Sequence, residues 1–150
     1  MPLNEFSLIH RLRVRWAEAD MQGVVFNAHY LAYFDLAITE YWRVLADGDQ
    51  AWLHETFEHL YVVKATVDFH APARFDDELQ VAARCSRLGR SSMTLEFEIH
   101  RGSDHLISGQ SIYVYALDSK SVSIPDDLRR RIARFEKSPP AAEVARTGSD

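Results

Sequence analysis

The stretch AEADMQGVVFNAHYLAYFDLAITEYW, from Ala17 to Trp42, places a short segment with an acid and a glycine directly before a long apolar one. In its second half, apolar residues recur at the spacing of an α-helix. We expect a helix from about Asn27 to Ala46, ended by Asp47-Gly48. Because apolar residues cover most of its circumference, other structure should enclose this helix. The apolar residues of the predicted helix are Tyr30, Leu31, Tyr33, Phe34, Leu36, Ala37, Ile38, Tyr41, Trp42 and Leu45.

Strand-like segments on both sides of this helix can enclose it. Apolar and polar residues alternate in residues 8–16, 61–69, 77–88, 93–99 and 106–117, whereas 49–59 is expected to be irregular. Consecutive strands joined by short turns form antiparallel sheets. The predicted fold class is α+β, with an antiparallel β-sheet wrapped around one long central helix. The residues expected to share one face are Leu12, Val14 and Trp16 in the first segment, Tyr61, Val63, Ala65, Val67 and Phe69 in the second, and Ile112, Val114 and Ala116 in the last.

Length and composition indicate one globular domain. The chain has 150 residues, of which 47% are hydrophobic and 26% charged. We place the domain at residues 1–137, with a short amphipathic helix at 126–137, and expect a flexible tail at 138–150.

Charge, hydropathy and cysteine content argue against several classes of protein. A net charge of -5 disfavours a general nucleic-acid binder. No apolar run has signal-peptide length or reaches the ~18 residues of a membrane helix, so we expect a cytoplasmic protein without a membrane span. Cys85 is the one cysteine, which excludes an intramolecular disulfide and a thiolate metal cluster. We expect it to be a small buried apolar group.

Asp20 lies between the first predicted strand and the long helix. Gly23 follows it, and the helix start near Asn27 offers unpaired N–H groups and the positive end of a dipole. Such N–H groups can stabilise an oxyanion while the carboxylate attacks a carbonyl or takes a proton from water. The alternative is that Asp20 merely caps a turn.

The segment EADMQGVVFNAHYLAYFDLAITEYW resembles the signature of hotdog-fold thioesterases of the 4-hydroxybenzoyl-CoA thioesterase and YbgC-like type. VDFHAPARFDDEL (67–79) is similar to the next strand of that family, and LGRSSMTLEFEIHR (88–101) to its following hairpin. The resemblance covers residues 8–118, with three motifs in the family's order. The residues that match the first motif in order are Asp20, Gly23, Val24, Val25, Phe26 and Tyr30.

This resemblance implies a hotdog domain that hydrolyses acyl-CoA or aryl-CoA thioesters and self-associates as a homodimer or homotetramer. Asp20 would be the nucleophile or the general base, and Gly23, Val25 and Phe26 would contact the substrate. Tyr30 would orient the loop or line the acyl channel, unless it is a plain core residue. No cofactor is expected, because coenzyme A is part of the substrate.

The sequence departs from the family just after the glycine. YbgC-like members often carry a histidine where this chain has Asn27, and His29 lies two positions further on. His29 is a candidate catalytic partner or a partly exposed helix-start residue. Asn27 is a candidate helix cap that could also hold the water or the thioester oxygen. Glu18 is expected to face solvent.

Arginines and serines of the predicted hairpin are candidate contacts for coenzyme A. By resemblance, the segment carrying Arg87, Arg90, Ser91 and Ser92 holds its nucleotide end. The alternative is a solvated strand edge. Arg74 is a second phosphate candidate.

The histidines do not predict a metal site. His54 and His59 are five residues apart, which does not place them on one face of a helix. Asp68 and His70 share a strand face and either line a neighbouring active site or form a surface hydrogen bond. Two other functions stay open: a dehydratase or isomerase that uses His29 or His70, and a non-catalytic acyl-CoA sensor.

Overall fold

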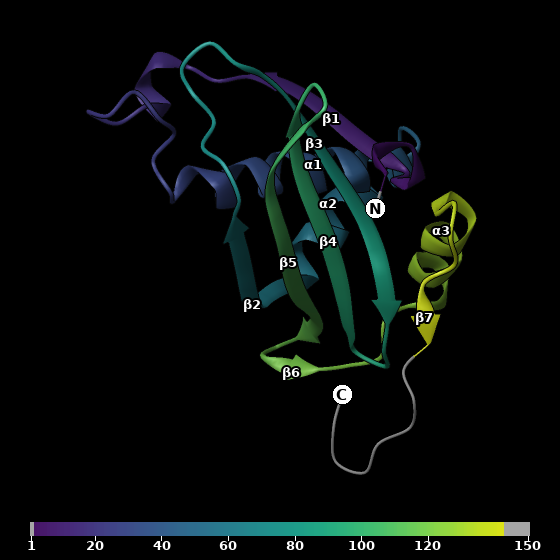
Figure 1. Ribbon diagram of the computed structural model, residues 1–150. Coiled ribbons are helices and arrows are strands. Elements are labelled where there is room, and N and C mark those ends of the chain that lie inside the picture. Colours follow the sequence, from purple (N-terminus) through teal and green to yellow (C-terminus); the bar gives the residue numbers. More distant parts are fainter. Residues whose placement is uncertain (1, 143–150) are drawn as a thin grey trace.

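The computed structural model describes residues 2–142 as an antiparallel sheet packed on one long helix (Figure 1). The sheet order is β1-β3-β4-β5-β2. The helices are α1 (His29–Ala46), α2 (Gln50–His59) and α3 (Asp126–Phe135), with 3₁₀ turns η1 (Leu3–Glu5) and η2 (Trp16–Glu18). The strands are β1 (Leu8–Arg13), β2 (Leu60–Phe69), β3 (Glu78–Leu88), β4 (Ser92–Arg101), β5 (Asp104–Leu117), β6 (Lys120–Ser121) and β7 (Ala141–Ala142). The α+β prediction is confirmed.

Helix α1 forms the centre of the core. It starts at His29, two residues later than predicted, and ends at Ala46, which is followed by Asp47 in the left-handed conformation. Phe34 on α1 stacks on Phe97 of β4, with ring centroids 4.5 Å apart. Gly109 of β5 makes room for Phe34, because a Cβ at that position would lie 2.3 Å from the ring. The buried residues of α1 are Tyr30, Tyr33, Phe34, Ala37, Ile38, Tyr41, Trp42, Leu45 and Ala46.

The segment 49–59, expected to be irregular, forms helix α2 from Gln50 to His59, so that expectation is wrong. The Asp49 side chain accepts a hydrogen bond from Trp52 N and caps the helix. Trp52 also donates from Nε1 to Asp127 on α3, 2.8 Å away, and the Arg131 guanidinium lies 4.3 Å from its ring centroid. Contacts with a distant segment thus support a helix whose own apolar pattern is weak.

Three strand predictions need correction. β1 ends at Arg13, and Trp16 lies in η2 with 75% of its surface exposed. A bulge at Val63 in β2 divides the residues expected to share one face, so Tyr61 lies on the opposite face from Val67. On β5 the residues turned to the core are Ser111, Tyr113 and Tyr115, not the expected Ile112, Val114 and Ala116 set, although Ala116 is itself buried.

The C-terminal segment crosses back onto the sheet. Glu136, which follows α3, accepts hydrogen bonds from Tyr41 Oη at 2.5 Å, Cys85 N at 2.8 Å and Ser7 Oγ at 3.0 Å. Cys85 is fully buried, as expected, and burial raises the pKa of its thiol to about 12. Ala141–Ala142, in the segment expected to be a flexible tail, pairs with β3 as β7; residues 143–150 lie outside the described residues. No described helix is long and apolar enough to cross a membrane.

Candidate active site

The loop that carries Asp20 is a tight turn fastened to the β2–β3 connection. Asp20 N donates to Val24 O at 2.8 Å and Gly23 N to Asp20 O at 3.0 Å. Gly23 has a φ of 78°, which glycine adopts without strain. Val25 N donates to Ala73 O at 2.8 Å, and Val24 forms a bridge with Arg74. Backbone bonds therefore fix where the carboxylate of Asp20 lies.

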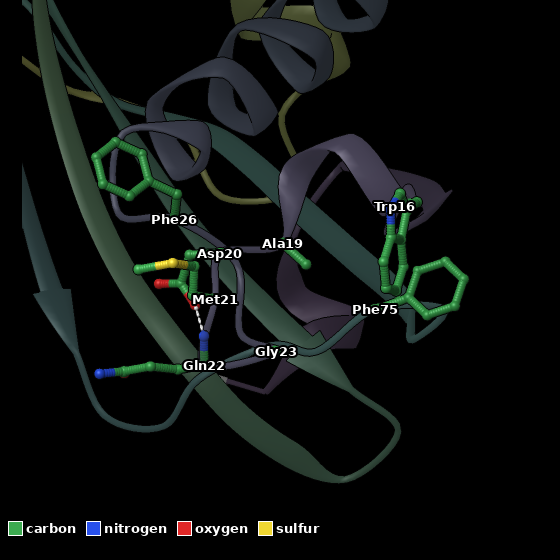
Figure 2. A pocket seen from close by; sticks show the side chains of 8 residues that line it. All are labelled: Trp16, Ala19, Asp20, Met21, Gln22, Gly23, Phe26 and Phe75. Atoms are coloured by element: carbon green, nitrogen blue, oxygen red, sulfur yellow. Dashed lines mark hydrogen bonds between the residues drawn. The ribbon is translucent and has the colours of Figure 1, made fainter.

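The Asp20 carboxylate is exposed and has two possible tasks. Its Oδ1 accepts a hydrogen bond from Gln22 N at 2.8 Å, shown as a dashed line in Figure 2. This contact is the turn-capping role that the sequence left open. The carboxylate also lines a cavity of 630 Å³, which falls in the size range of small-molecule sites.

Aromatic side chains form much of that cavity, and sequence reasoning missed most of its lining. The ring centroids of Trp16 and Phe75 are 5.0 Å apart, edge to face, although the two residues lie far apart in the chain (Figure 2). Phe26 was predicted, and it is 54% exposed. Exposed aromatic residues in irregular segments carry no periodic signal, so only the structure identifies them. The lining consists of Trp16, Ala19, Asp20, Met21, Gln22, Gly23, Phe26 and Phe75.

The start of α1 differs from the expectation that Asn27 caps it. The N-cap residue is Ala28, and no side chain caps the helix. His29 N donates to Phe26 O at 2.9 Å and Tyr30 N to Asn27 O at 3.3 Å. Within residues 2–142, the N–H groups of Asn27 and Ala28 have no protein acceptor. Two backbone donors without a protein acceptor among the described residues thus lie just before the helix.

The two residues in the unusual positions lie differently. Asn27 is exposed, and His29 is half-buried with its ring centroid 6.1 Å from that of Phe26. Neither His29 nor Asn27 is among the residues that line the cavity. Their catalytic roles remain predictions.

Tyr30 and Val25 support the loop from the core side. Tyr30 is 1% exposed, and its Oη accepts a hydrogen bond from Ala73 N at 3.0 Å. Burial raises the pKa of Tyr30, so the hydroxyl stays protonated. Val25 is also buried. Tyr30 and Val25 therefore hold the loop and the β2–β3 connection together and do not line the cavity.

Glu18 is buried, so the expectation that it faces solvent is wrong. It accepts hydrogen bonds from Arg15 N at 2.7 Å, Arg15 Nη2 at 2.8 Å and Tyr33 Oη at 2.9 Å. Burial raises the pKa of Glu18, but these hydrogen bonds outweigh it and the net pKa lies below the ordinary value. Glu18 O also accepts from Phe26 N, so this residue braces both sides of the loop.

The arginines predicted to bind coenzyme A lie at two separate places. Exposed Arg74 is bridged to the Asp20 loop through Val24. The β3–β4 turn lies at the opposite end of the sheet from the loop before α1 (Figure 1). There, Arg90 Nη1 donates to Ser123 Oγ at 3.3 Å. One chain therefore does not bring that turn to Asp20.

The other hairpin candidates differ in accessibility. Arg87 is exposed and Ser92 is half-buried, whereas Ser91 is 1% exposed and its backbone oxygen accepts from Tyr115 N. Ser91 therefore has little surface to offer a ligand within one chain.

His54 and His59, the pair weighed as metal ligands, are both on α2.

Comparison with known proteins gives consistent relatives. Residues 22–108 match the thioesterase superfamily. The chain is 30% identical over 107 residues to the acyl-CoA thioester hydrolase YbgC of Escherichia coli O6:H1, covering 71% of this chain and 79% of that protein. It is 29% identical over 121 residues to the acyl-CoA thioesterase YbgC of Haemophilus influenzae, covering 79% and 88% of the two chains.

Solved structures agree with these sequence relatives. A thioesterase from Thermus thermophilus, crystallised with coenzyme A and Zn, superimposes with a TM-score of 0.81 at 30% identity. The match covers 90% of this chain and 98% of that one. Together with the sheet order and central helix, it confirms the predicted hotdog fold.

Proposed function

The chain belongs to the thioesterase superfamily, and on that premise we propose that it hydrolyses acyl-CoA or aryl-CoA thioesters to free acid and coenzyme A. One observation carries the proposal. The Asp20 carboxylate lines a cavity of 630 Å³, and the N–H groups of Asn27 and Ala28, which have no acceptor in the described part of the chain, follow Phe26 of the same lining.

In the proposed reaction, the donors polarise the thioester carbonyl. The N–H groups of Asn27 and Ala28, with the positive end of the α1 dipole, stabilise the negative charge that develops on its oxygen. Asp20 then acts by one of two routes. As a nucleophile, it forms an anhydride and expels the thiolate of coenzyme A, and water cleaves the anhydride. As a base, it takes a proton from the water that attacks the carbonyl directly, and the tetrahedral intermediate then expels the thiolate of coenzyme A and leaves the free acid.

The cavity wall and the nearby cation suit the two ends of such a substrate. The rings of Trp16, Phe26 and Phe75 offer an apolar surface for the acyl or aryl group. Arg74, exposed beside the loop, offers a cation for a phosphate group. Tyr30 acts as a positioning residue, because it contacts the backbone that holds the loop.

Self-association is part of the proposal. β2 is an edge strand, paired with β5 on one side, and it exposes the apolar residues Tyr61, Val62, Val63 and Phe69. A second copy pairing along this edge would cover them and would bring further residues to the loop of its partner. The arginines of the β3–β4 turn would then serve a neighbouring subunit. The cytoplasmic location remains a prediction.

The test compares wild type with Asp20→Asn on a panel of acyl-CoA and aryl-CoA thioesters. Release of free thiol and equilibrium binding of the thioesters are both measured. We expect Asp20→Asn to lower thiol release by about 10²-fold or more while binding persists. Glu58→Gln, which alters an exposed acid on α2, is the matched control and should retain full activity.

Three other results would contradict the proposal. Undiminished hydrolysis by Asp20→Asn would remove Asp20 from the reaction. Binding without thiol release from any substrate would indicate the acyl-CoA sensor. An enoyl product without thiol release would indicate the dehydratase.

A further inference from the structure

The outer face of the sheet, which points away from α1, carries a compact group of potential metal ligands. Glu98 and His100 lie on β4, and His105 lies on β5. One ligand-type atom of each lies within 4.8 Å of the other two. We call these three residues the outer-face cluster. It contains neither Asp20 nor any residue that lines the cavity.

A β-bulge assembles the cluster. Across β4 and β5, Ile99 pairs with Ile107, but His100 pairs with His105, so Leu106 is the additional residue. Leu106 and Ile107 are consequently both buried. Without the bulge, strand alternation would turn His105 to the other face of the sheet. The sequence search for metal ligands missed the cluster because its spacing follows this bulge and no helix.

The distances inside the cluster suit a small metal ion. Glu98 Oε1 lies 2.8 Å from His100 Nε2 and 3.7 Å from His105 Nε2. Neighbouring ligands of a tetrahedral zinc ion, with bonds of about 2.0–2.1 Å, are about 3.3 Å apart. The three atoms are therefore close enough to share one ion, once a rotation of His100 or His105 turns the ring out of their parallel stack and points its nitrogen at the ion.

Glu98 and His100 are largely buried, whereas His105 is accessible to an ion from solvent. The side chains of Glu98 and His100 are 13% and 12% exposed, whereas that of His105 is 37% exposed. The rings of His100 and His105 are stacked, with centroids 4.6 Å apart. His105 Nε2 also lies 3.0 Å from Ser108 Oγ and 2.9 Å from Ile107 O, contacts that it would exchange for the metal.

Neighbouring polar groups are placed to support metal-bound histidines. Ser108 Oγ lies 3.0 Å from Nε2 of His70, which follows β2. Gln80 pairs across the strands with His100, and its Oε1 is buried without a hydrogen-bond partner in the described part of the chain. An acceptor of this kind suits the second ring nitrogen of a metal-bound imidazole.

We propose that the outer-face cluster binds one borderline divalent transition-metal ion, such as Zn²⁺, through Glu98 Oε1 and one ring nitrogen each of His100 and His105. Water would complete the coordination. Two imidazoles and one carboxylate favour such ions, whereas Mg²⁺ and Ca²⁺ prefer oxygen ligands. The ion would join β4 to β5 at the bulge and stabilise the fold away from the Asp20 cavity.

The experiment titrates Zn²⁺ into metal-stripped protein, without a purification tag, by calorimetry. Wild type should bind one equivalent, and its melting temperature should be higher with Zn²⁺ than with a chelator. Glu98→Gln and His100→Ala should each weaken binding by at least about tenfold, since even the loss of an outer partner costs about 10–100-fold. His54→Ala, which removes an exposed histidine of α2, and Asp20→Asn should bind like wild type.

The variants also decide between a specific site and adventitious binding. Circular dichroism verifies that each one folds, and Glu98→Gln preserves side-chain shape if His100→Ala does not fold. Absence of Zn²⁺ binding by wild type would overturn the proposal. Equal binding by wild type and Glu98→Gln, or loss of binding in His54→Ala or Asp20→Asn, would do the same.

Discussion

Two buried glutamates from different parts of the chain are held in similar ways, yet Glu18 braces the loop that carries Asp20 and Glu136 anchors the segment that follows α3. Tyr33 Oη of α1 donates to Glu18, and Tyr41 Oη, about two turns further along, donates to Glu136. Each glutamate also accepts a backbone N–H, from Arg15 or from Cys85. The helix thus fastens two distant segments through one kind of bond.

The difference lies in what else each carboxylate contacts. Glu18 forms an ion pair with Arg15, whose side chain is largely exposed. The hydrogen-bond donors to Glu136 are neutral, and Tyr41 and Cys85 among them are fully buried. Removing Glu18 leaves one buried donor, the Tyr33 hydroxyl, and a cation that water can solvate. Removing Glu136 leaves two buried donors without partners, the Tyr41 hydroxyl and the Cys85 N–H. Such donors cost more free energy.

The largest expected effect is therefore that of Glu136→Ala on stability. Loss of the carboxylate should lower the free energy of unfolding by about 3 kcal/mol, because the Tyr41 hydroxyl and Cys85 N–H stay buried and unpaired. Urea denaturation measures this loss. Thiol release at a temperature where the variant is folded should stay within about twofold of wild type, since none of the hydrogen-bond partners described for Glu136 lies in the Asp20 loop or lines the cavity.

Glu18→Ala should affect activity more, and stability less, than Glu136→Ala does. We expect a smaller loss of stability, about 2 kcal/mol, but about a tenfold fall in kcat for thioester hydrolysis, because the loop of Asp20 loses a brace. The same denaturation and kinetic assays apply. If Glu136→Ala lowered kcat as much as Glu18→Ala, the two glutamates would not differ in function.

Removing a single hydroxyl tests the helix side of each bond. Tyr41→Phe and Tyr33→Phe should each cost about 1 kcal/mol of unfolding free energy, with the larger loss at Tyr41. Only Tyr33→Phe should also lower kcat, because its partner supports the loop. Equal kcat values for the two variants would show that the hydrogen bond from Tyr33 to Glu18 does not support the loop.

The smallest effect is on the pH dependence of stability. The folded-state pKa of Glu18 lies below its ordinary value of 4.5, so its stabilisation is present above that pH and is lost as pH falls through the folded-state pKa. The difference in unfolding free energy between wild type and Glu18→Gln should accordingly shrink below about pH 4.5. A difference that stays constant from pH 7 to 3 would contradict it.

The sequence predicted those helices and strands whose own hydrophobic periodicity determines their structure. The apolar stripe of α1 and the alternation in β3 and β4 predicted the core, because burial alone sets those periods. Helix α2 was missed because an Asp49 cap and the contacts of Trp52 with α3 support it. The bulge at Val63 was missed because nothing in the strand pattern marks an additional residue.

The candidate site was predictable to a similar extent. Asp20, Gly23 and Phe26 were found from the motif and do line the cavity. Trp16 and Phe75 were missed, since their nearness depends on two irregular segments that meet only in three dimensions. The burial of Glu18 was missed as well, because its partner Tyr33 lies on the next element.

The exposed rings of Trp16 and Phe75 also bear on how such a protein could change its substrate. They shape the cavity from its surface, while the backbone bonds of Val24 and Val25 and the hydroxyl of Tyr30 fix the loop from beneath. Exchanging a surface ring alters stability little, whereas altering a buried contact is costly. Selection could therefore remodel the proposed acyl pocket one side chain at a time, and the same two positions are where an engineer should start.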